Sequence, residues 1–276
     1  IFDAVEAEPG VENLDKAGRL VREGGYSLLV GLGGGSAIDV AKGCSILATN
    51  PGRIEDYFGV EKVGKPGLPL IAIPTTAGTG AEVTMNAIFA DHKKKLKIGV
   101  VSPFLIPAAA IVDPALTITV PPSVTAATGM DALTHAVESF TALKASPQTD
   151  LYALKAIELI AGSLRTAVFN GKDVKARTDM ATGSLFAGIS LANAGVGAVH
   201  ALAYPVGGQF GISHGVSNAL LLPYVMEFNV PGDLQKFAAV AQVMGESTAG
   251  KSPRDAAFSA VKAVRELSID IGIPQS

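Results

Sequence analysis

The hydrophobic pattern of this sequence changes near residue 120, and that change constrains the fold more than any other feature. Before it, short apolar runs alternate with helical segments and with turns rich in Gly or Pro. We expect strands over residues 27–30, 70–73 and 109–112, the last of them buried, and helices over residues 11–23 and 36–49. Strands that alternate with helices favour a parallel α/β sheet.

After residue 120 the pattern is helical almost throughout. One helix is expected between Ser146-Pro147 and Asn170-Gly171, and another begins at Ser252-Pro253. The first of them carries apolar residues every three or four positions, namely Leu151, Leu154, Ile157, Ile160, Leu164 and Val168. The sequence therefore predicts a partial Rossmann-like α/β domain over residues 1–119, followed by an all-helical domain over residues 120–276.

Composition and charge argue against several classes of protein. Lys and Arg together number 22 against 25 for Asp and Glu, and a net charge of −3 does not attract a phosphate backbone. The apolar runs are much shorter than a membrane span, and the single cysteine, Cys44, cannot form an internal disulfide. We expect a cytoplasmic protein that binds neither nucleic acid nor a membrane. Because the chain starts at Ile1 and stops directly after a helical pattern, we interpret it as a piece of a longer protein.

A Gly-rich turn joins the first expected strand to a helix. Residues 28–42 read LLVGLGGGSAIDVAK, which is close to the dinucleotide-binding fingerprint but has Ser36 in place of the third Gly. Glycines let a pyrophosphate approach backbone N–H groups, and a helix N-terminus favours negative charge. We expect a cofactor phosphate here; the alternative is a tight strand-to-helix turn without a ligand.

A second turn follows another expected strand. Residues 70–84 read LIAIPTTAGTGAEVT, in which Thr75, Thr76 and Thr79 offer hydroxyl groups next to Gly78 and Gly80. Ligands of parallel sheets lie beyond the carboxyl ends of the strands, so we expect both turns to face one crevice. The alternative for the Thr-rich turn is a solvated loop.

Three of the four histidines, together with one aspartate, predict a metal site. Asp131 precedes His135 by four residues, which places both on one face of a helix. With His200 and His214 they form a set of one carboxylate and three imidazoles, which suits Fe²⁺ or Zn²⁺. The alternative is that each histidine is a hydrogen-bonded part of the core.

The segment between the last two of these histidines determines whether they meet. It contains Pro205, Gly207 and Gly208, where we expect the chain to turn back and bring both imidazoles to one point. His92 is different, because it lies in a charged turn beside the basic run 93–97, and we interpret it as solvated.

Several motifs together resemble the iron-dependent (group III) alcohol dehydrogenase family over essentially the whole chain. They read GGGSAIDVAK, IPTTAGTGAEVT, GMDALTHAVES, and the pair GAVHALAYPVGG and GISHGVSNALLLP. Members are longer at both ends, so the resemblance implies a truncated version. It also implies a dehydroquinate synthase-like fold, with a nicotinamide-binding domain, a helical metal-binding domain and a reaction site in the cleft between them.

The resemblance assigns residues to both sites. The family's metal ligands fall on Asp131, His135, His200 and His214, the residues that the spacing also selects. The pyrophosphate contacts fall on Gly34, Gly35, Ser36 and Asp39, and further cofactor contacts on Thr75, Thr76, Thr79, Thr84, Lys97 and Leu116. A positive charge at Lys97 suits an anionic cofactor; the alternative for Lys97 is a surface position in the basic run.

One position departs from the family pattern. Many members carry a further histidine, in the proton path of the alcohol, four residues after the ligand that matches His200. This chain has Tyr204 there. We expect its phenol to take that role. One alternative is a proton path through the cofactor ribose and water, and the other is that Tyr204 only packs against the cleft.

The resemblance implies a reaction as well as a fold. It implies NAD- or NADP-dependent oxidation of a primary alcohol or small diol, reversible to reduction of the aldehyde, with the metal as a Lewis acid. We expect a homo-oligomer, in its simplest form a dimer, because strands left at a sheet edge pair readily. The alternatives are a zinc-dependent glycerol dehydrogenase, a dehydroquinate synthase-like lyase, a non-catalytic metal-binding module and a structural remnant.

Overall fold

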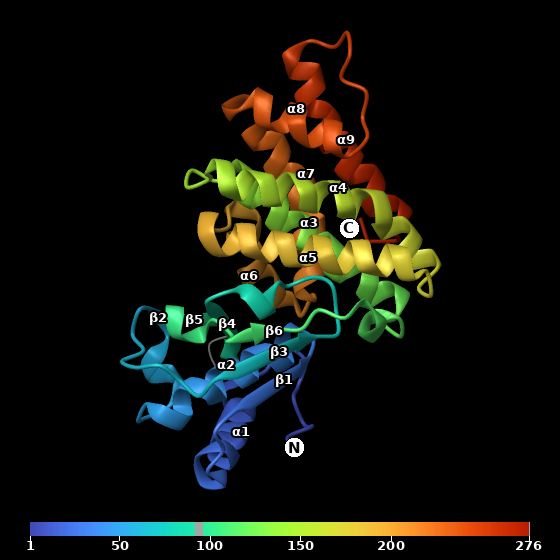
Figure 1. Ribbon diagram of the computed structural model, residues 1–276. Helices are drawn as coiled ribbons and strands as arrows, with labels where there is room; N and C mark the ends of the chain where they lie inside the picture. Colours follow the sequence, from blue (N-terminus) through green and yellow to red (C-terminus); the bar gives the residue numbers. More distant parts are fainter. Residues whose placement is uncertain (92–95, 276) are drawn as a thin grey trace. The chain divides into compact units, whose positions relative to one another are not determined.

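The structure, a computed structural model, describes residues 1–91 and 96–275. The chain divides into two compact units (Figure 1). The α/β unit comprises Ile1–Thr75 and Ala81–Asp113, and the helical unit comprises Thr76–Gly80 and Pro114–Ser276. The interpretation of His92 falls outside the described residues, and the assignment of a cofactor domain and a metal domain on either side of residue 120 stays a prediction.

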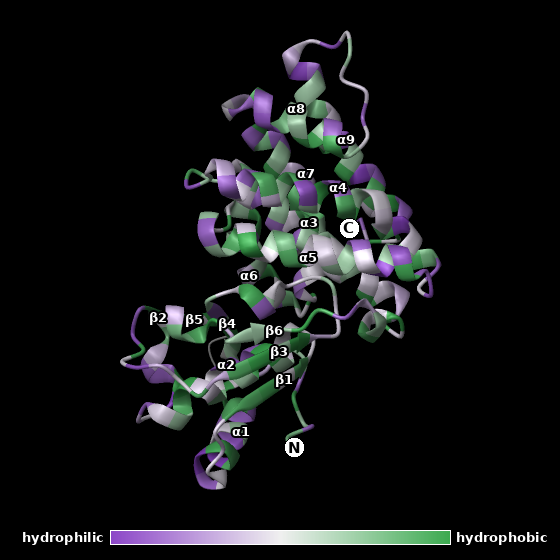
Figure 2. Ribbon diagram, in the orientation of Figure 1, coloured by the Kyte–Doolittle hydropathy of each residue, from purple (hydrophilic) through white to green (hydrophobic). Residues whose placement is uncertain are grey.

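The α/β unit is built on a parallel sheet. Its strands β1 (Leu29–Gly33), β3 (Leu70–Pro74) and β6 (Ala109–Ala110) lie in the order β1-β3-β6. Helix α2 (Gly35–Thr49) returns from β1 and packs against it, and α1 (Val11–Gly24) packs against α2. β1 and β3 are largely hydrophobic, as Figure 2 shows. The predicted parallel α/β arrangement is confirmed.

The same unit holds a second sheet that the sequence analysis does not predict. Strands β2 (Gly59–Val60), β5 (Leu96–Val101) and β4 (Asn86–Asp91) lie in the order β2-β5-β4, and β4 runs antiparallel to β5. Ala87 and Phe89 of β4 are buried and alternate with less buried neighbours, which is the period of a strand. This alternation is the sequence feature that predicts a strand, but the adjacent basic run favours a charged turn.

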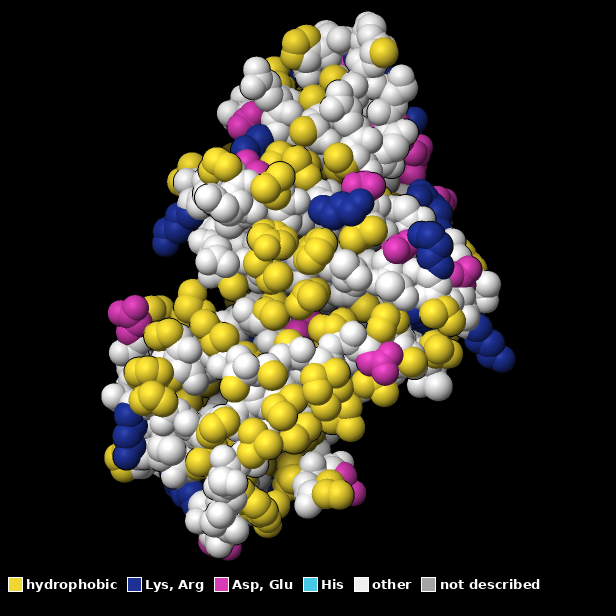
Figure 3. All heavy atoms as spheres, in the orientation of Figure 1, with side chains coloured by type: hydrophobic (Ala, Val, Ile, Leu, Met, Phe, Trp, Pro, Cys, Tyr) yellow, Lys and Arg dark blue, Asp and Glu magenta, His cyan; other side chains and the backbone are white. Residues whose placement is uncertain are grey.

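Strand β6 is shorter and more exposed than predicted. The apolar residues 109–112 favour a buried strand, but β6 has only two residues and both are exposed. The reason is that β6 lies at one edge of the sheet, among the strands that the structure describes. At the other edge, β1 exposes Val30 and Leu32 by 55% and 58%. Hydrophobic side chains are gathered on this unit in the view of Figure 3.

The helical unit packs long helices around one apolar core. In chain order they are α3 (Pro122–Thr141), α4 (Pro147–Phe169), α5 (Val174–Ala194), α6 (Ala198–Phe210), α7 (His214–Asn229), α8 (Leu234–Val243) and α9 (Pro253–Asp270). Helix α3 contacts α4, α5 and α7, and its Met130 and Leu133 are completely buried. Most of the buried core residues of this unit lie on α3 and on these three helices.

Two of these helices begin where their caps predict. The Ser146 hydroxyl accepts a hydrogen bond from the Thr149 N–H at the start of α4, and the Ser252 hydroxyl accepts one from the Asp255 N–H at the start of α9. Each serine is followed by a proline, which suits the first helical position. The predicted starts of both helices are confirmed.

Short 3₁₀ helices occur between the longer elements, at Ile54–Tyr57, Ala81–Val83, Pro103–Leu105, Pro114–Thr117 and Val230–Gly232.

Among the described residues, no single helix has the length and apolar character needed to cross a membrane. The helices α5 and α6 meet that criterion only when taken together, and they are bent by 104°.

Candidate metal centre

Helix α3 places a carboxylate and an imidazole on one face. Asp131 and His135 lie one helical turn apart, and both are buried, with 2% and 5% of their surface exposed. The His135 Nε2 lies 3.8 Å from the Asp131 Oδ1. The structure therefore brings together the two residues that the four-residue spacing predicts to be neighbours.

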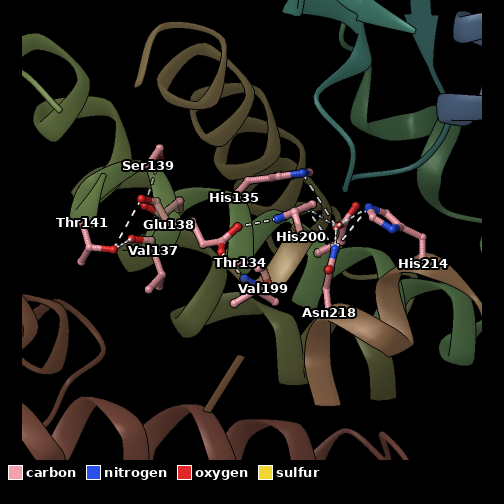
Figure 4. Close-up of polar contacts among 12 residues, drawn as sticks. Thr134, His135, Val137, Glu138, Ser139, Thr141, Val199, His200, His214 and Asn218 are labelled. Carbon is pink, nitrogen blue, oxygen red and sulfur yellow. Dashed lines mark hydrogen bonds and ion pairs between the residues drawn. The ribbon is translucent and has the colours of Figure 1, made fainter. Parts of the chain in front are cut away.

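Helices α6 and α7 bring two further imidazoles to the same carboxylate. The Nε2 atoms of His200 and His214 each lie 3.6 Å from the Asp131 Oδ1. Figure 4 shows both imidazoles directed at one point, beside Asn218. One ligand atom from each of Asp131, His200 and His214 lies within 4.8 Å of the other two. His135 is not in this closest set, but its ring stacks on that of His200 with 4.6 Å between the centroids.

The turn that allows this meeting lies later in the chain than predicted. Pro205, Gly207 and Gly208 are inside α6, so the tertiary context overrides their low helix propensity. The helix ends before Gly211, whose φ of 67° is a left-handed conformation that glycine adopts without strain. Helix α7 then starts at His214 itself.

Asn218 lies among the ligand atoms, and the sequence analysis misses it. Its Nδ2 donates a hydrogen bond to the Asp131 Oδ1 at 2.7 Å, and it lies 3.1 Å from the His200 Nε2 and 3.2 Å from the His214 Nε2. Asn218 follows His214 by four residues, so the spacing that selects Asp131 and His135 also points to it.

Glu138 is the second residue that the sequence analysis misses. Its Oε2 lies 2.6 Å from the His200 Nδ1, and its Oε1 accepts a hydrogen bond from the Val199 N–H at 2.6 Å. Glu138 is only 4% exposed. A glutamate on the apolar part of a helix needs a partner once it is buried, and this is the sequence feature that points to it.

Protonation is strongly coupled within this cluster. Burial lowers the pKa of His135 to about 4. Burial also opposes a charge on His200, but hydrogen bonds to Asp131 and Glu138 prevail and raise its pKa to about 9. Burial disfavours the carboxylate of Asp131 as well, yet the imidazoles, His135 first, hold the pKa of Asp131 below its usual range. The cluster therefore favours a positive charge next to an ionised Asp131.

The donor set of this cluster fits a divalent cation. The amide group of Asn218 faces three polar atoms, the Asp131 Oδ1 and the Nε2 atoms of His200 and His214. It has only two hydrogens to donate, so it cannot bond to all three. The His135 Nδ1 and the Asn218 Oδ1 are buried without a hydrogen-bond partner among the described residues. A carboxylate with imidazoles is a ligand set for Fe²⁺ or Zn²⁺. Such a cation would supply the positive charge that the cluster favours next to Asp131.

The Gly-rich turn of the α/β unit has the strand-to-helix form that its sequence predicts. Strand β1 ends at Gly33, Gly34 precedes α2, and Gly35 is the first residue of that helix. No side chain of the described residues caps α2, which is the arrangement that suits an anion at a helix N-terminus. The Ser36 hydroxyl accepts a hydrogen bond from the Glu8 N–H at 3.2 Å.

Two of the predicted cofactor contacts have partners inside the α/β unit. The Asp39 Oδ2 accepts a hydrogen bond from the Ile88 N–H at 3.0 Å, and enclosure of the carboxylate by protein raises the pKa of Asp39 to about 6. The Thr84 hydroxyl accepts a hydrogen bond from the Lys42 ammonium at 3.1 Å. These contacts join α2 to β4 and to the segment before it, and the cofactor roles of Asp39 and Thr84 stay predictions.

The Thr-rich turn is divided between the two units. The Thr75 N–H donates to the Gly33 carbonyl at 2.9 Å within the α/β unit, whereas Thr76 and Thr79 belong to the helical unit. Leu116 also belongs to the helical unit, where it is 38% exposed. That the two turns face one crevice stays a prediction.

The glycines of the same turn approach the helical unit closely. A Cβ added at Gly78 would lie 2.7 Å from the Thr128 side chain of α3, and one at Gly80 would lie 2.6 Å from the Gly188 backbone of α5. Gly80 also has a φ of 62°. Only glycine fits both positions, and the turn is therefore a packed segment rather than a solvated loop.

Lys97 is not a solvated member of the basic run. Its side chain is only 8% exposed, and its Nζ lies 2.7 Å from the Glu8 Oε1. Its contact with a cofactor stays a prediction.

Tyr204 lies beside the cluster of Asp131, His200 and His214. Its ring stacks on that of His214, with 5.7 Å between the centroids and 10° between the planes. The residue is one helical turn after His200 on α6. The role of its phenol stays a prediction.

Comparison with known proteins identifies one family for both parts of the chain. Residues 1–114 match the family described as iron-containing alcohol dehydrogenase, and residues 125–276 match the C-terminal region of the Fe-containing alcohol dehydrogenase family. The long-chain-alcohol dehydrogenase 1 of Geobacillus thermodenitrificans is 46% identical over 100% of this chain and 70% of that protein.

Solved structures agree with this match. A crystal structure of 1,3-propanediol oxidoreductase has 45% identity and a TM-score of 0.97 over 100% of this chain and 72% of that one. A sulfoacetaldehyde reductase from Bifidobacterium kashiwanohense, solved in complex with NAD⁺, has 33% identity and a TM-score of 0.87 over 100% of this chain and 71% of that one.

This chain is therefore an oxidoreductase of the alcohol dehydrogenase class, which interconverts alcohols and aldehydes. It belongs to the iron-containing alcohol dehydrogenase family. The resemblance noted in the sequence, and the fold and reaction class that it implies, are confirmed.

Proposed function

We propose that the chain uses Fe²⁺ and NAD to interconvert a primary alcohol or small diol and its aldehyde. The observation that carries this proposal is the buried cluster of Asp131, His200 and His214, with His135 beside it. The family description supports iron over zinc, and the relative solved with NAD⁺ supports NAD over NADP.

The metal ligands of this chain have complementary tasks. Asp131 supplies a negative charge, and His135, His200 and His214 supply neutral nitrogen ligands. These residues would hold a metal ion that supplies Lewis acidity toward the substrate oxygen, and a bound nicotinamide would supply the hydride acceptor. Because Asp131, His135 and His200 are buried, bulk water does not screen their charges and dipoles.

The dinucleotide is assigned to the α/β unit. Backbone N–H groups of Gly34, Gly35 and Ser36 bind the pyrophosphate at the N-terminus of α2, where the helix dipole favours negative charge. Further contacts are assigned, as the sequence predicts, to Asp39, Thr75, Thr76, Thr79, Thr84, Lys97 and Leu116.

Tyr204 is assigned the transfer of the proton to and from the alcohol oxygen. A phenol both donates and accepts hydrogen bonds, so it can pass on a proton without a permanent charge. Its position beside His214 supports this role.

The substrate class follows the similar proteins as well as the site. A 1,3-propanediol oxidoreductase and a long-chain-alcohol dehydrogenase resemble this chain to almost the same degree, and both names describe alcohols. The two alcohols differ in the length of their carbon chains. This difference supports the primary alcohol group, rather than the rest of the carbon chain, as the common feature of the substrate.

Assembly and location complete the proposal. The exposed apolar residues of β1, at the edge of its sheet, support a homo-oligomer, in its simplest form a homodimer. A cytoplasmic location stays a prediction from the sequence.

Replacing His200 with Ala tests the proposal. The variant should lose metal retention and turnover together, because it lacks a ligand at the centre of the cluster. Elemental analysis after dialysis measures the first, and NADH formation from 1,3-propanediol or 1-propanol measures the second. Replacing the exposed Lys155 with Ala is the control. Full turnover by a verified metal-free protein would overturn the proposal.

A further inference from the structure

His200 lies between two carboxylates that face opposite sides of its ring. Its Nε2 faces Asp131 and the metal-binding cluster, whereas its Nδ1 lies 2.6 Å from the Glu138 Oε2 (Figure 4). At that distance the Nδ1 carries a hydrogen that Glu138 accepts. We propose that Glu138 is a positioning residue, which holds His200 in the tautomer that directs the Nε2 lone pair toward the metal. This inference rests on the proposed metal site.

Glu138 itself is held firmly. Backbone N–H groups of Gly197 and Val199 donate to its carboxylate, the latter at 2.6 Å. These residues form the start of α6, so the carboxylate also places a negative charge at the N-terminus of the helix that carries His200. Gly197 is required for this contact, because a Cβ there would lie 2.8 Å from the Glu138 Oε1.

The arrangement needs two acceptor oxygens, which distinguishes a carboxylate from an amide. In Glu138→Gln the side chain has only one oxygen. The backbone N–H groups of Gly197 and Val199 can only donate hydrogen bonds, so this oxygen must face them. The amide NH₂ then faces the His200 Nδ1, which must become an acceptor and move its hydrogen to Nε2. His200 would then present a hydrogen, not a lone pair, to the metal.

Glu138→Ala has a different consequence. It removes the acceptor but places no donor against Nδ1, so His200 keeps access to the metal-binding tautomer. A positioning role therefore predicts that Gln, the closer match in shape, is the more harmful replacement. A purely structural role predicts the reverse order.

The test measures Zn²⁺ affinity of the full chain by competition with a chromophoric chelator, because Zn²⁺ has no redox chemistry. Loss of such a supporting hydrogen bond weakens metal binding by about 10–100-fold. We expect that increase in Kd for Glu138→Gln and a smaller one for Glu138→Ala. Ser139→Ala is the matched control. Ser139 is buried one residue further along α3, and among the contacts described its hydroxyl bonds only to the Ala136 carbonyl. The Kd of this variant for Zn²⁺ should equal that of the wild type.

Nitrogen-15 NMR of the imidazoles gives a readout independent of affinity. With the metal-free chain at alkaline pH, so that the His200 imidazole is neutral, the wild-type Nδ1 should carry the hydrogen, and in Glu138→Gln that hydrogen should be on Nε2. A wild-type His200 with its hydrogen on Nε2 alone would overturn the inference, even if neither variant folds.

The outcomes separate this inference from the proposed function. If the wild-type chain does not bind Zn²⁺, the proposed function fails and the inference fails with it. If the wild type binds and Glu138→Gln binds equally well, or better than Glu138→Ala, only the positioning role is overturned.

Discussion

The phenol of Tyr204 occupies a position where the resemblance implies a histidine in many members of the family. Its ring lies almost parallel to that of His214, so the chain keeps a planar polar side chain next to the cluster. A phenylalanine would preserve this stacking and remove only the hydroxyl. The position therefore allows a clean separation of packing from proton transfer.

Tyr204→Phe should lower kcat by about 100-fold or more, because a general acid–base group contributes roughly 10²–10⁴-fold. KM for the alcohol and the retained metal content should change little, since no ligand is removed. Steady-state kinetics with 1-propanol measure both constants. Tyr152→Phe, at a half-exposed position on α4, is the control. An unchanged kcat would show that Tyr204 only packs.

Single residues also show what the sequence can predict. Asp131 and His135 are found by helical spacing, and His200 and His214 by residue type, because metal ligands come from few kinds of side chain. Asn218 has the same four-residue spacing from His214, and Glu138 lies three residues after His135, but both are ordinary hydrogen-bonding residues in a sequence. Their importance depends on helices α3, α6 and α7 meeting, which only the tertiary structure reveals.

At the scale of elements, Lys42 connects α2 to the second sheet. It is completely buried, and its ammonium donates to the Thr84 carbonyl at 2.8 Å and to the Asn86 carbonyl at 2.9 Å. Burial lowers the pKa of Lys42 to about 8, although Asp39 and then Glu82 oppose that change. A buried cation is retained here because it satisfies carbonyls at the start of β4.

Lys42→Met should destabilise the chain by about 1–3 kcal/mol or more, since it leaves buried acceptors without a donor. Urea unfolding followed by circular dichroism gives the free energy of unfolding. Lys262→Met on α9 is the control, because Lys262 is exposed and forms a surface ion pair with Glu266; such pairs contribute about 0.3–0.5 kcal/mol. Equal effects of the two substitutions would contradict the connecting role of Lys42.

Elements differ in how well the sequence predicts them. The starts of α4 and α9 are encoded locally by a capping serine and a proline. The pairing of β4 with β5 and the continuation of α6 through Pro205 depend on packing partners, and local propensity does not contain that information.

At the scale of the whole molecule, we expect metal binding and stability to be coupled through His200. Its pKa of about 9 in the folded, metal-free chain is above the ordinary value of 6.5. The extra proton therefore stabilises the metal-free fold fully below pH about 6.5, and this contribution is lost as pH rises through about 9. A metal ion must displace that proton, so the stabilisation by metal changes with pH in the opposite direction.

Thermal melts from about pH 6 to about pH 8.5 test this coupling. Without metal, the His200 contribution to Tm should decline with rising pH, whereas the increase in Tm caused by a fixed excess of Zn²⁺ should grow. His135 opposes this trend at the acid end of the range, because its folded pKa of about 4 is below the ordinary 6.5 and its contribution to stability is lost as pH falls below about 6.5. The His200 contribution is therefore the difference in Tm between the wild type and His200→Ala at each pH. In His200→Ala both trends should vanish, and a metal-induced shift independent of pH in the wild type would contradict the coupling.

The five residues Thr76–Gly80 have a consequence for how this protein can be taken apart. They are assigned to the helical unit, although the segments before and after them belong to the α/β unit. The polypeptide thus passes from one unit to the other three times, and no single cut separates them. Expressing residues 114–276 alone would remove Gly78 and Gly80, which pack against α3 and α5. Gene fusions and exchanges with relatives must therefore transplant this short insert together with the helices that receive it.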